Sequence, residues 1–210
     1  MDNKVPKTIL DVLKTNGGAE YKAPKRVSDE NEAERYVALY ASSKEALDSF
    51  GELIFELGAA TDMASLYHRN VLDGSRRRIR EYFWGELRQV KHFQSPESIS
   101  VFAEKCGEET RYRVSLEIDE LHADEATLKK HNSLLDLPLA DGCVIAINDS
   151  GVKDLIYTVS REEAMRLMRD SNYKKAQVCY LIQGCAEENL FQELVNGIGK
   201  IQPYYEYVIK

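Results

Sequence analysis

Two runs of alternating apolar and polar side chains constrain the fold of this chain more than any other feature. They cover residues 98–104 and 111–117, and the segment 106–109 between them has the length and glycine content of a hairpin loop. In that register Glu104 lies opposite Arg111, so polar side chains share one face of both strands. The opposite face is apolar, with Ile99 opposite Leu116, Val101 opposite Val114, and Ala103 opposite Tyr112. The sequence therefore predicts an antiparallel hairpin with one buried face.

Helical spacing of apolar residues predicts several helices around this hairpin. Ser42 and Glu45 have the spacing of a capping box, and Gly58 stands where a helix C-cap belongs. We therefore expect a helix over 43–57, whose buried face carries Leu47, Phe50, Ile54 and Leu57. A second helical segment is expected over 61–90, with an interruption at 73–75. Further helices are expected over 124–135, 160–168 and 186–196.

Further strands are indicated by β-branched and aromatic residues or by short apolar runs. They are expected over 35–41, 143–147, 155–159, 176–182 and 204–209. Hairpins mixed with helices favour an α+β fold. We expect a mixed, largely antiparallel sheet with helices packed on at least one face.

The first thirty residues differ in character from the rest of the chain. We expect residues 1–30 to form an N-terminal arm, a short helix plus a linker, and residues 31–210 to form a single α+β domain with a helical segment near 61–90. A helix of this length is unstable alone in water, so its apolar residues need a surface on which to dock. Ile9, Leu10 and Leu13 are therefore candidate partner-binding residues. The docking surface is either this domain or a partner protein.

Composition limits the class of protein. Hydrophobic residues make up 43% and charged residues 30% of 210 residues, as in ordinary folded domains. The net charge of -7 argues against sequence-independent nucleic-acid binding by the whole surface, so any such contact has to be local. No apolar run approaches the ~18 residues that a membrane span needs, and residues 1–15 lack the apolar stretch of a secretory signal. We therefore expect a cytoplasmic protein that neither spans nor binds a membrane and whose four scattered cysteines are reduced.

Four arginines in one short segment, Arg76, Arg77, Arg78 and Arg80, are the most unusual local feature. In the predicted helix they occupy the first turn, where positive charge opposes the helix dipole. A phosphate, a nucleic-acid backbone or an acidic protein patch would relieve that cost, so these residues form a candidate anion-binding site. The alternative is that they pair with the chain's own carboxylates. Trp84 nearby is expected in the core rather than as a platform for stacking bases.

Catalytic motifs are absent from the sequence. Glu104, Lys105, Glu117 and Asp119 could in principle serve a metal-dependent nuclease, but the expected pairing of Glu104 with Arg111 explains these charges without a metal. The histidines show no zinc spacing, and no phosphate-binding or nucleophile motif occurs. We therefore predict no cofactor and no metal site.

Three tyrosines are clustered near the C-terminal end of the sequence. Tyr204, Tyr205 and Tyr207 crowd the expected last strand, either as a partner surface or as ordinary edge-strand residues. With the arm and the arginines, they favour a non-catalytic interaction or regulatory subunit that presents surfaces to a protein or nucleoprotein partner. The alternative is a nucleotide- or nucleic-acid-processing enzyme with an Arg phosphate site and sheet-borne carboxylates.

Overall fold

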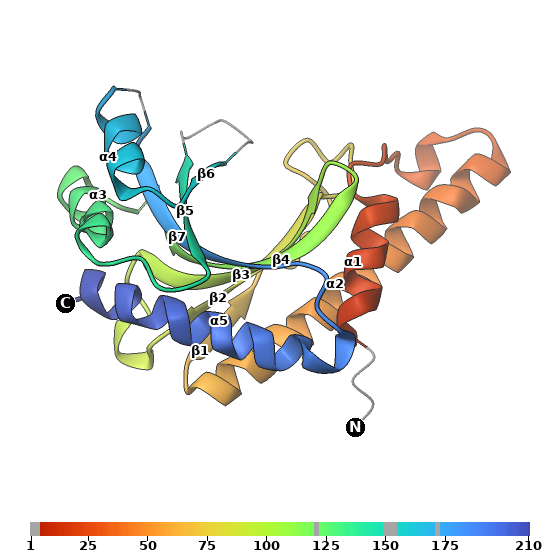
Figure 1. Ribbon diagram of the computed structural model, residues 1–210. Coiled ribbons are helices and arrows are strands. Elements are labelled where there is room, and N and C mark those ends of the chain that lie inside the picture. The colour runs from red at the N-terminus through yellow and green to blue at the C-terminus, as the bar shows by residue number, and fades with distance from the viewer. Residues whose placement is uncertain (1–4, 120–121, 149–154, 171–172) are drawn as a thin grey trace.

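Five helices and a seven-stranded sheet make up the computed structural model, which describes residues 5–119, 122–148, 155–170 and 173–210 (Figure 1). The helices are α1 (Val5–Asn16), α2 (Glu30–Thr61), α3 (Glu125–Asn132), α4 (Arg161–Asp170) and α5 (Glu187–Val208). The strands are β1 (Ala64–Tyr67), β2 (Tyr82–Arg88), β3 (Glu97–Cys106), β4 (Glu109–Ile118), β5 (Cys143–Asn148), β6 (Ile156–Thr158) and β7 (Lys175–Ile182). Short 3-10 helices span Pro24–Arg26, Val90–His92 and Ser133–Asp136.

Every strand pairing in the sheet is antiparallel, in the order β1-β2-β3-β4-β7-β5-β6. The predicted α+β class is therefore confirmed. The register of the β3–β4 hairpin is also as predicted, with Val101 opposite Val114 and Glu104 opposite Arg111. Alternation specified this register because a slip of one residue would turn the apolar set outward.

Helices cover one face of the sheet and form the core there. Helix α2 packs on β1 and β2, and α5 packs on β3, β4 and β7, as Figure 1 shows beneath the sheet. Phe50 and Ile54 of α2 are fully buried, in the face predicted for this helix. Gly85 lets α2 approach β2 closely, because a Cβ there would lie 2.6 Å from a side-chain carbon of Ile54.

The segment predicted as a second helix over 61–90 is instead two strands and a loop, β1 and β2 with residues 68–81 between them. The apolar residues Ile79, Phe83 and Leu87 are four apart, which suits a helix face. The same spacing also places Phe83 and Leu87 on one face of a strand, and both are buried in β2. The intervening Gly85 is buried as well, which completes the two-residue period.

Two predicted strands are helical. Residues 35–41 lie in the first half of α2, and residues 204–208 lie in the last turns of α5. Aromatic residues raised the strand propensity of both segments, but tertiary burial of Tyr36, Tyr204 and Tyr205 along helix faces outweighs that weak preference. Helix α2 also begins earlier than expected, at Glu30. Its N-cap is Asp29, whose carboxylate accepts from the amide of Glu32, and its C-cap is Asp62, in the left-handed region.

Helix α1 packs on the body of the same chain. Its neighbours are α2, β3 and β4, and Ile9 and Leu13 are both buried in the core while Leu10 packs against it. The Asn16 side-chain amide donates to the hydroxyls of Ser42 and Ser43, at 2.9 and 3.0 Å. In this structure α1 thus docks on its own chain. Among the described residues no helix combines the length and the apolar character that crossing a membrane requires.

Candidate binding surface on the open face of the sheet

The face of the sheet opposite α2 and α5 carries polar, charged and aromatic side chains, and we call it the open face. Because side chains alternate along a strand, every second residue of four strands points to this side. No helix of the described ranges lies across it in Figure 1. Its residues are Tyr82, Trp84, Glu86 and Arg88 of β2, Ser98, Ser100, Phe102 and Glu104 of β3, Arg111, Arg113, Ser115 and Glu117 of β4, and Gln177 and Cys179 of β7.

A network of ion pairs occupies the centre of the open face. Arg113 is only 5% exposed and bridges two carboxylates: its Nε lies 3.2 Å from Glu104 Oε2 and its Nη1 lies 3.1 Å from Glu117 Oε1. Arg111 Nε lies 2.7 Å from Glu104 Oε1. Lys175 Nζ lies 3.4 Å from Glu117 Oε2. The acids on this face are therefore engaged by basic side chains.

Burial and charge act in opposite directions on these groups. Burial works to raise the pKa of the Glu117 carboxyl, but the charges of Lys175 and Arg113 outweigh it and hold that pKa below its usual value. For Arg113, burial works to lower the pKa, and the charge of Glu104 outweighs it, so the guanidinium stays protonated. Arg113 and Glu117 are thus both ionised, as an ion pair requires. A general acid, by contrast, has to carry a proton that it can give away.

Tyr157 on β6 closes one side of the network. Arg111 Nη2 donates to Tyr157 Oη at 2.7 Å, although β6 is three positions from β4 in the sheet. The sheet must therefore curl towards its open face. Burial raises the pKa of Tyr157 to about 12 and that of the Cys179 thiol to about 12, so neither is an ionised nucleophile at neutral pH. Gln177 Oε1 is buried and has no hydrogen-bond partner among the described residues.

Aromatic side chains form a continuous row beside the ion pairs. His68 stacks on Trp84 with ring centroids 3.7 Å apart and planes 20° apart. The ring centroid of Tyr82 lies 5.5 Å from that of Trp84 and 6.4 Å from that of Phe102, and Tyr82 is 41% exposed. We call these four residues the aromatic row. A recess of about 240 Å³ lies beside it, lined by Trp84, Phe102, Ser98 and Ser100 among others.

Trp84 therefore lies on the open face rather than in the core as expected. The core prediction failed because it assumed a helix in this segment, whereas in β2 the side chains of Phe83 and Trp84 point to opposite sides of the sheet. Arg80 packs beside the indole, with its guanidinium carbon 5.2 Å from the ring centroid of Trp84. The guanidinium of Arg113 covers the ring of Phe102 at 3.9 Å.

The arginine cluster lies in the loop before β2, so the prediction that it occupies the first turn of a helix is wrong. Arg76, Arg77 and Arg78 are exposed, and Arg76 has a positive φ of 55°. None of these three, nor Arg80, forms an ion pair with any described residue, although the chain has a surplus of acids. Arg80 Nε instead donates to the backbone oxygen of Leu72 at 3.0 Å.

A second basic segment lies against this loop. The amide of Tyr21 donates to the backbone oxygen of Arg77 at 2.6 Å, and Glu20 pairs with Arg78 in an isolated antiparallel bridge. Figure 1 shows the chain after α1 running beside the loop before β2. This pairing brings two segments together that are more than fifty residues apart in the sequence. We call their basic residues the basic rim: Lys22, Lys25, Arg26, Arg76, Arg77, Arg78 and Arg80.

The predicted tyrosine surface is mostly internal. Tyr204 and Tyr205 are buried, and Tyr204 Oη donates to the backbone oxygen of Pro138 at 2.7 Å. The hydroxyl of Tyr205 accepts from the amide of Gln89 at 3.1 Å. Only Tyr207 is exposed, at 39%. The three tyrosines therefore do not share one accessible surface, and neither do Ile9 and Leu13 of α1.

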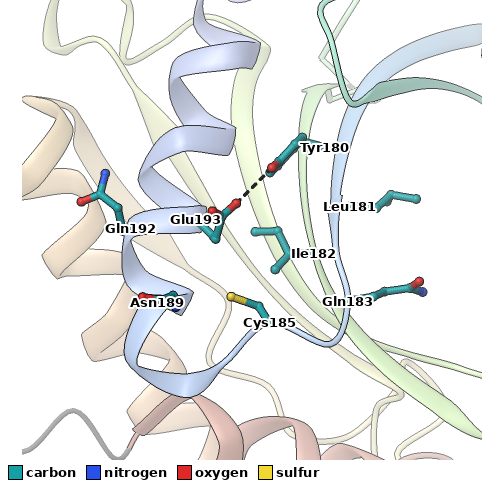
Figure 2. A pocket seen from close by; sticks show the side chains of 8 residues that line it. All are labelled: Tyr180, Leu181, Ile182, Gln183, Cys185, Asn189, Gln192 and Glu193. Carbon is teal, nitrogen blue, oxygen red and sulfur yellow. Dashed lines mark hydrogen bonds between the residues drawn. The ribbon is translucent and has the colours of Figure 1, made fainter.

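A separate depression of about 360 Å³ lies between the end of β7 and the start of α5 (Figure 2). Its lining is mixed, with Leu181 and Ile182 beside polar residues, and the hydroxyl of Tyr180 donates to Glu193 Oε2 at 3.0 Å. Cys185 also lines it, but burial, aided by the charge of Glu193, raises the pKa of its thiol. A raised thiol pKa disfavours the thiolate, so the depression lacks an activated nucleophile.

Comparisons with known proteins find no relatives: no protein-family model matches this chain, and no curated protein or solved structure is significantly similar to it. Within the described ranges no three His, Cys, Asp or Glu side chains are grouped to hold a metal ion. Lys105, one of the residues considered for a nuclease, is drawn away from the acids and donates from Nζ to the backbone oxygen of Gly17 at 3.0 Å. Lys105 is thus separated from the acids, whereas Glu104 and Glu117 meet at Arg113 on the open face, and Glu117 and Asp119 line the same recess.

Proposed function

We propose that this protein is a non-catalytic interaction subunit that binds a macromolecular partner through the open face of its sheet. The observation that carries the proposal is the position of the aromatic row. Tyr82 and Trp84 project from β2 on the side without a covering helix among the described residues, and Tyr82 is 41% exposed. Aromatic side chains and arginines are the residues most enriched at the energetic centres of interfaces.

The state of the acids supports a binding role over the enzymatic alternative. Glu104 and Glu117 are both held by Arg113, and a carboxylate in such pairs is neither a good proton donor nor free to bind a metal ion. A buried network of this kind instead fixes the geometry of the surface around it. All four cysteines are unpaired, which supports a reducing compartment, the cytoplasm, as the place of the interaction.

A pair of matched tyrosine substitutions tests the proposal. The affinity-tagged full chain is purified from its native source, and bound protein and nucleic acid are identified for three forms: the natural chain, Tyr82→Ser and Tyr207→Ser. The two tyrosines are similarly exposed, at 41% and 39%, but lie on different surfaces. We expect Tyr82→Ser to reduce recovery of the specific partner at least tenfold, since aromatic anchors often carry 2 kcal/mol or more of binding energy.

Tyr207→Ser serves as the control and should leave recovery unchanged. It also tests the predicted tyrosine surface at the end of the chain. If Tyr207→Ser removes the partner and Tyr82→Ser does not, the interaction surface is on α5 and the proposal fails. Thermal melts of all three forms show whether a loss of recovery reflects unfolding instead of a lost contact.

A further inference from the structure

We propose that the partner bound at the open face is a single-stranded nucleic acid, whose phosphates lie on the basic rim and whose bases stack on the aromatic row. This inference rests on the function proposed above and names the chemical class of the partner. It follows from three features: the charge of the rim, its fixed geometry, and its direct continuation into the exposed ring of Tyr82 and the partly exposed rings beside it.

The basic rim is a local positive region on an acidic protein. Segments 20–26 and 73–81 together contain seven basic and three acidic residues, whereas the whole chain carries a net charge of -7. Of the seven, only Lys22 has an ion pair with a described residue, at 3.8 Å from the partly exposed Glu32. Exposed cations without counterions in a chain rich in acids are suited to an anionic ligand. Guanidinium groups in particular match phosphate oxygens.

The backbone of the rim is held in place by internal hydrogen bonds. The amide of Gly18 donates to the backbone oxygen of Ile79 at 3.0 Å, and the amide of Ile79 donates to that of Ala19 at 3.0 Å. The carboxylate of Asp73 accepts from the hydroxyl of Ser75 at 2.7 Å and from the amide of Arg77 at 3.2 Å. Residues 18–21 and 77–79 are thus held together before any ligand binds, which lowers the entropic cost of recognition.

The aromatic row begins where the rim ends. Tyr82 is two residues after Arg80, and the guanidinium carbon of Arg80 lies 5.9 Å from the ring centroid of Tyr82 and 5.2 Å from that of Trp84. A strand lying on the rim would therefore present its next bases to the exposed ring of Tyr82. Stacking on aromatic rings beside a positively charged groove is how sequence-tolerant proteins hold single strands.

The same geometry disfavours a duplex and an acidic protein. In a duplex the bases are stacked within the helix, so only the phosphates could be used and Tyr82 would contribute nothing. An acidic protein patch would also be attracted by the rim, but it offers no flat rings for the aromatic row. A single strand is the ligand that uses both parts of the surface.

Fluorescence anisotropy with labelled oligonucleotides tests the inference on the full chain. The probes are single-stranded RNA and single-stranded DNA of about 20 nucleotides, longer than most single-strand sites, and a duplex of the same DNA sequence. Each is titrated at several salt concentrations. The variants are Tyr82→Ser, the double substitution Arg77→Gln with Arg78→Gln, and the control Arg166→Gln with Arg169→Gln on α4, which changes the net charge equally.

We expect both kinds of single strand to bind more tightly than the duplex, with an affinity that falls as salt rises. The rim variant should shallow the slope of log K against log[salt] by about 1.5 if each arginine holds one phosphate. Tyr82→Ser should weaken binding roughly 5- to 100-fold and leave the slope unchanged, because a stacking contact releases no counterions. The α4 control should bind as the natural chain does.

Three results would overturn the inference. These are no binding of either single strand, binding that is equal in the rim variant and the α4 control, or a duplex that binds as tightly as the single strands. If neither single strand binds while Tyr82→Ser still loses a protein partner in the purification described above, the proposed function stands and only the assignment of the partner as a nucleic acid is wrong. If Tyr82→Ser affects neither experiment, both proposals fail.

Discussion

At the scale of the residue, Arg113 organises the open face. Its side chain contacts both Glu104 and Glu117, and it also covers the ring of Phe102. Its neighbours on β3 and β4 could be predicted, since the pairing of Glu104 with Arg111 follows from the hairpin register. Its burial could not, because that depends on the curl of the sheet and on side chains from β6 and β7.

Replacing Arg113 should destabilise the fold strongly. The substitution Arg113→Met keeps most of the side-chain volume but leaves Glu104 and Glu117 in the sheet without their shared partner. We expect a loss of about 3 to 5 kcal/mol in the free energy of unfolding, as for one partner removed from a buried pair. Urea denaturation measures it.

Lys44→Met is the matched control, because Lys44 pairs with Asp48 on the exposed side of α2. It should cost about 1 kcal/mol at most. Equal losses for the two variants would mean that the network on the open face is no more important than a surface pair.

His131 should make stability depend on pH. It is fully buried, its Nε2 lies 3.0 Å from the backbone oxygen of Ala176, and burial lowers its pKa to about 4. The unfolded chain takes up a proton on this residue below about pH 6.5, whereas the folded chain does not until about pH 4. The unfolded state therefore binds more protons between these values, and stability falls as pH falls.

The expected loss from this residue between pH 7 and pH 5 is about 2 kcal/mol. Urea denaturation at the two pH values measures it, with His131→Leu as the comparison. The variant should lose less stability than the natural chain over this interval, even if it is less stable at pH 7. Parallel pH profiles for the two proteins would show that His131 is not the group responsible.

At the scale of the element, local patterns predicted what depends on neighbours in sequence and failed where a distant surface decides. The β3–β4 hairpin was predicted to the residue because its alternation and short loop are both local. Residues 35–41 were predicted as a strand from their aromatic content. In the structure Tyr36 of α2 packs against Tyr21, a contact that no local sequence pattern indicates.

The loop before β2 shows the same limit for an element of the proposed binding surface. The arginines were recognised as unusual for a reason that is wrong, their supposed place in the first turn of a helix. What sets them apart in the structure is that they have no ion pairs with described residues and that the last of them, Arg80, lies next to the aromatic row. Alternation of Tyr82, Trp84 and Glu86 with buried residues was the signal that could have indicated a strand there.

At the scale of the whole molecule, the proposed binding surface is assembled from segments that are remote in sequence. Residues 20–26 contribute to the rim only because the chain after α1 pairs with the loop before β2. The sequence indicated an α+β domain and an arm, but left open where the arm docks. Such long-range pairing depends on the packing of the complete core, so composition and periodicity could not reveal it.

The central claim is that a single strand binds across the open face, and Trp84 can report on it directly. It is the only tryptophan among the 210 residues, and it lies in the aromatic row. The measurement is its intrinsic fluorescence during titration with an unlabelled single-stranded oligonucleotide. The account predicts a saturable change in emission with the same midpoint as the anisotropy curve, and a matching shift of that midpoint in Tyr82→Ser. Saturated binding with unchanged Trp84 emission would place the ligand elsewhere on the protein and contradict the account.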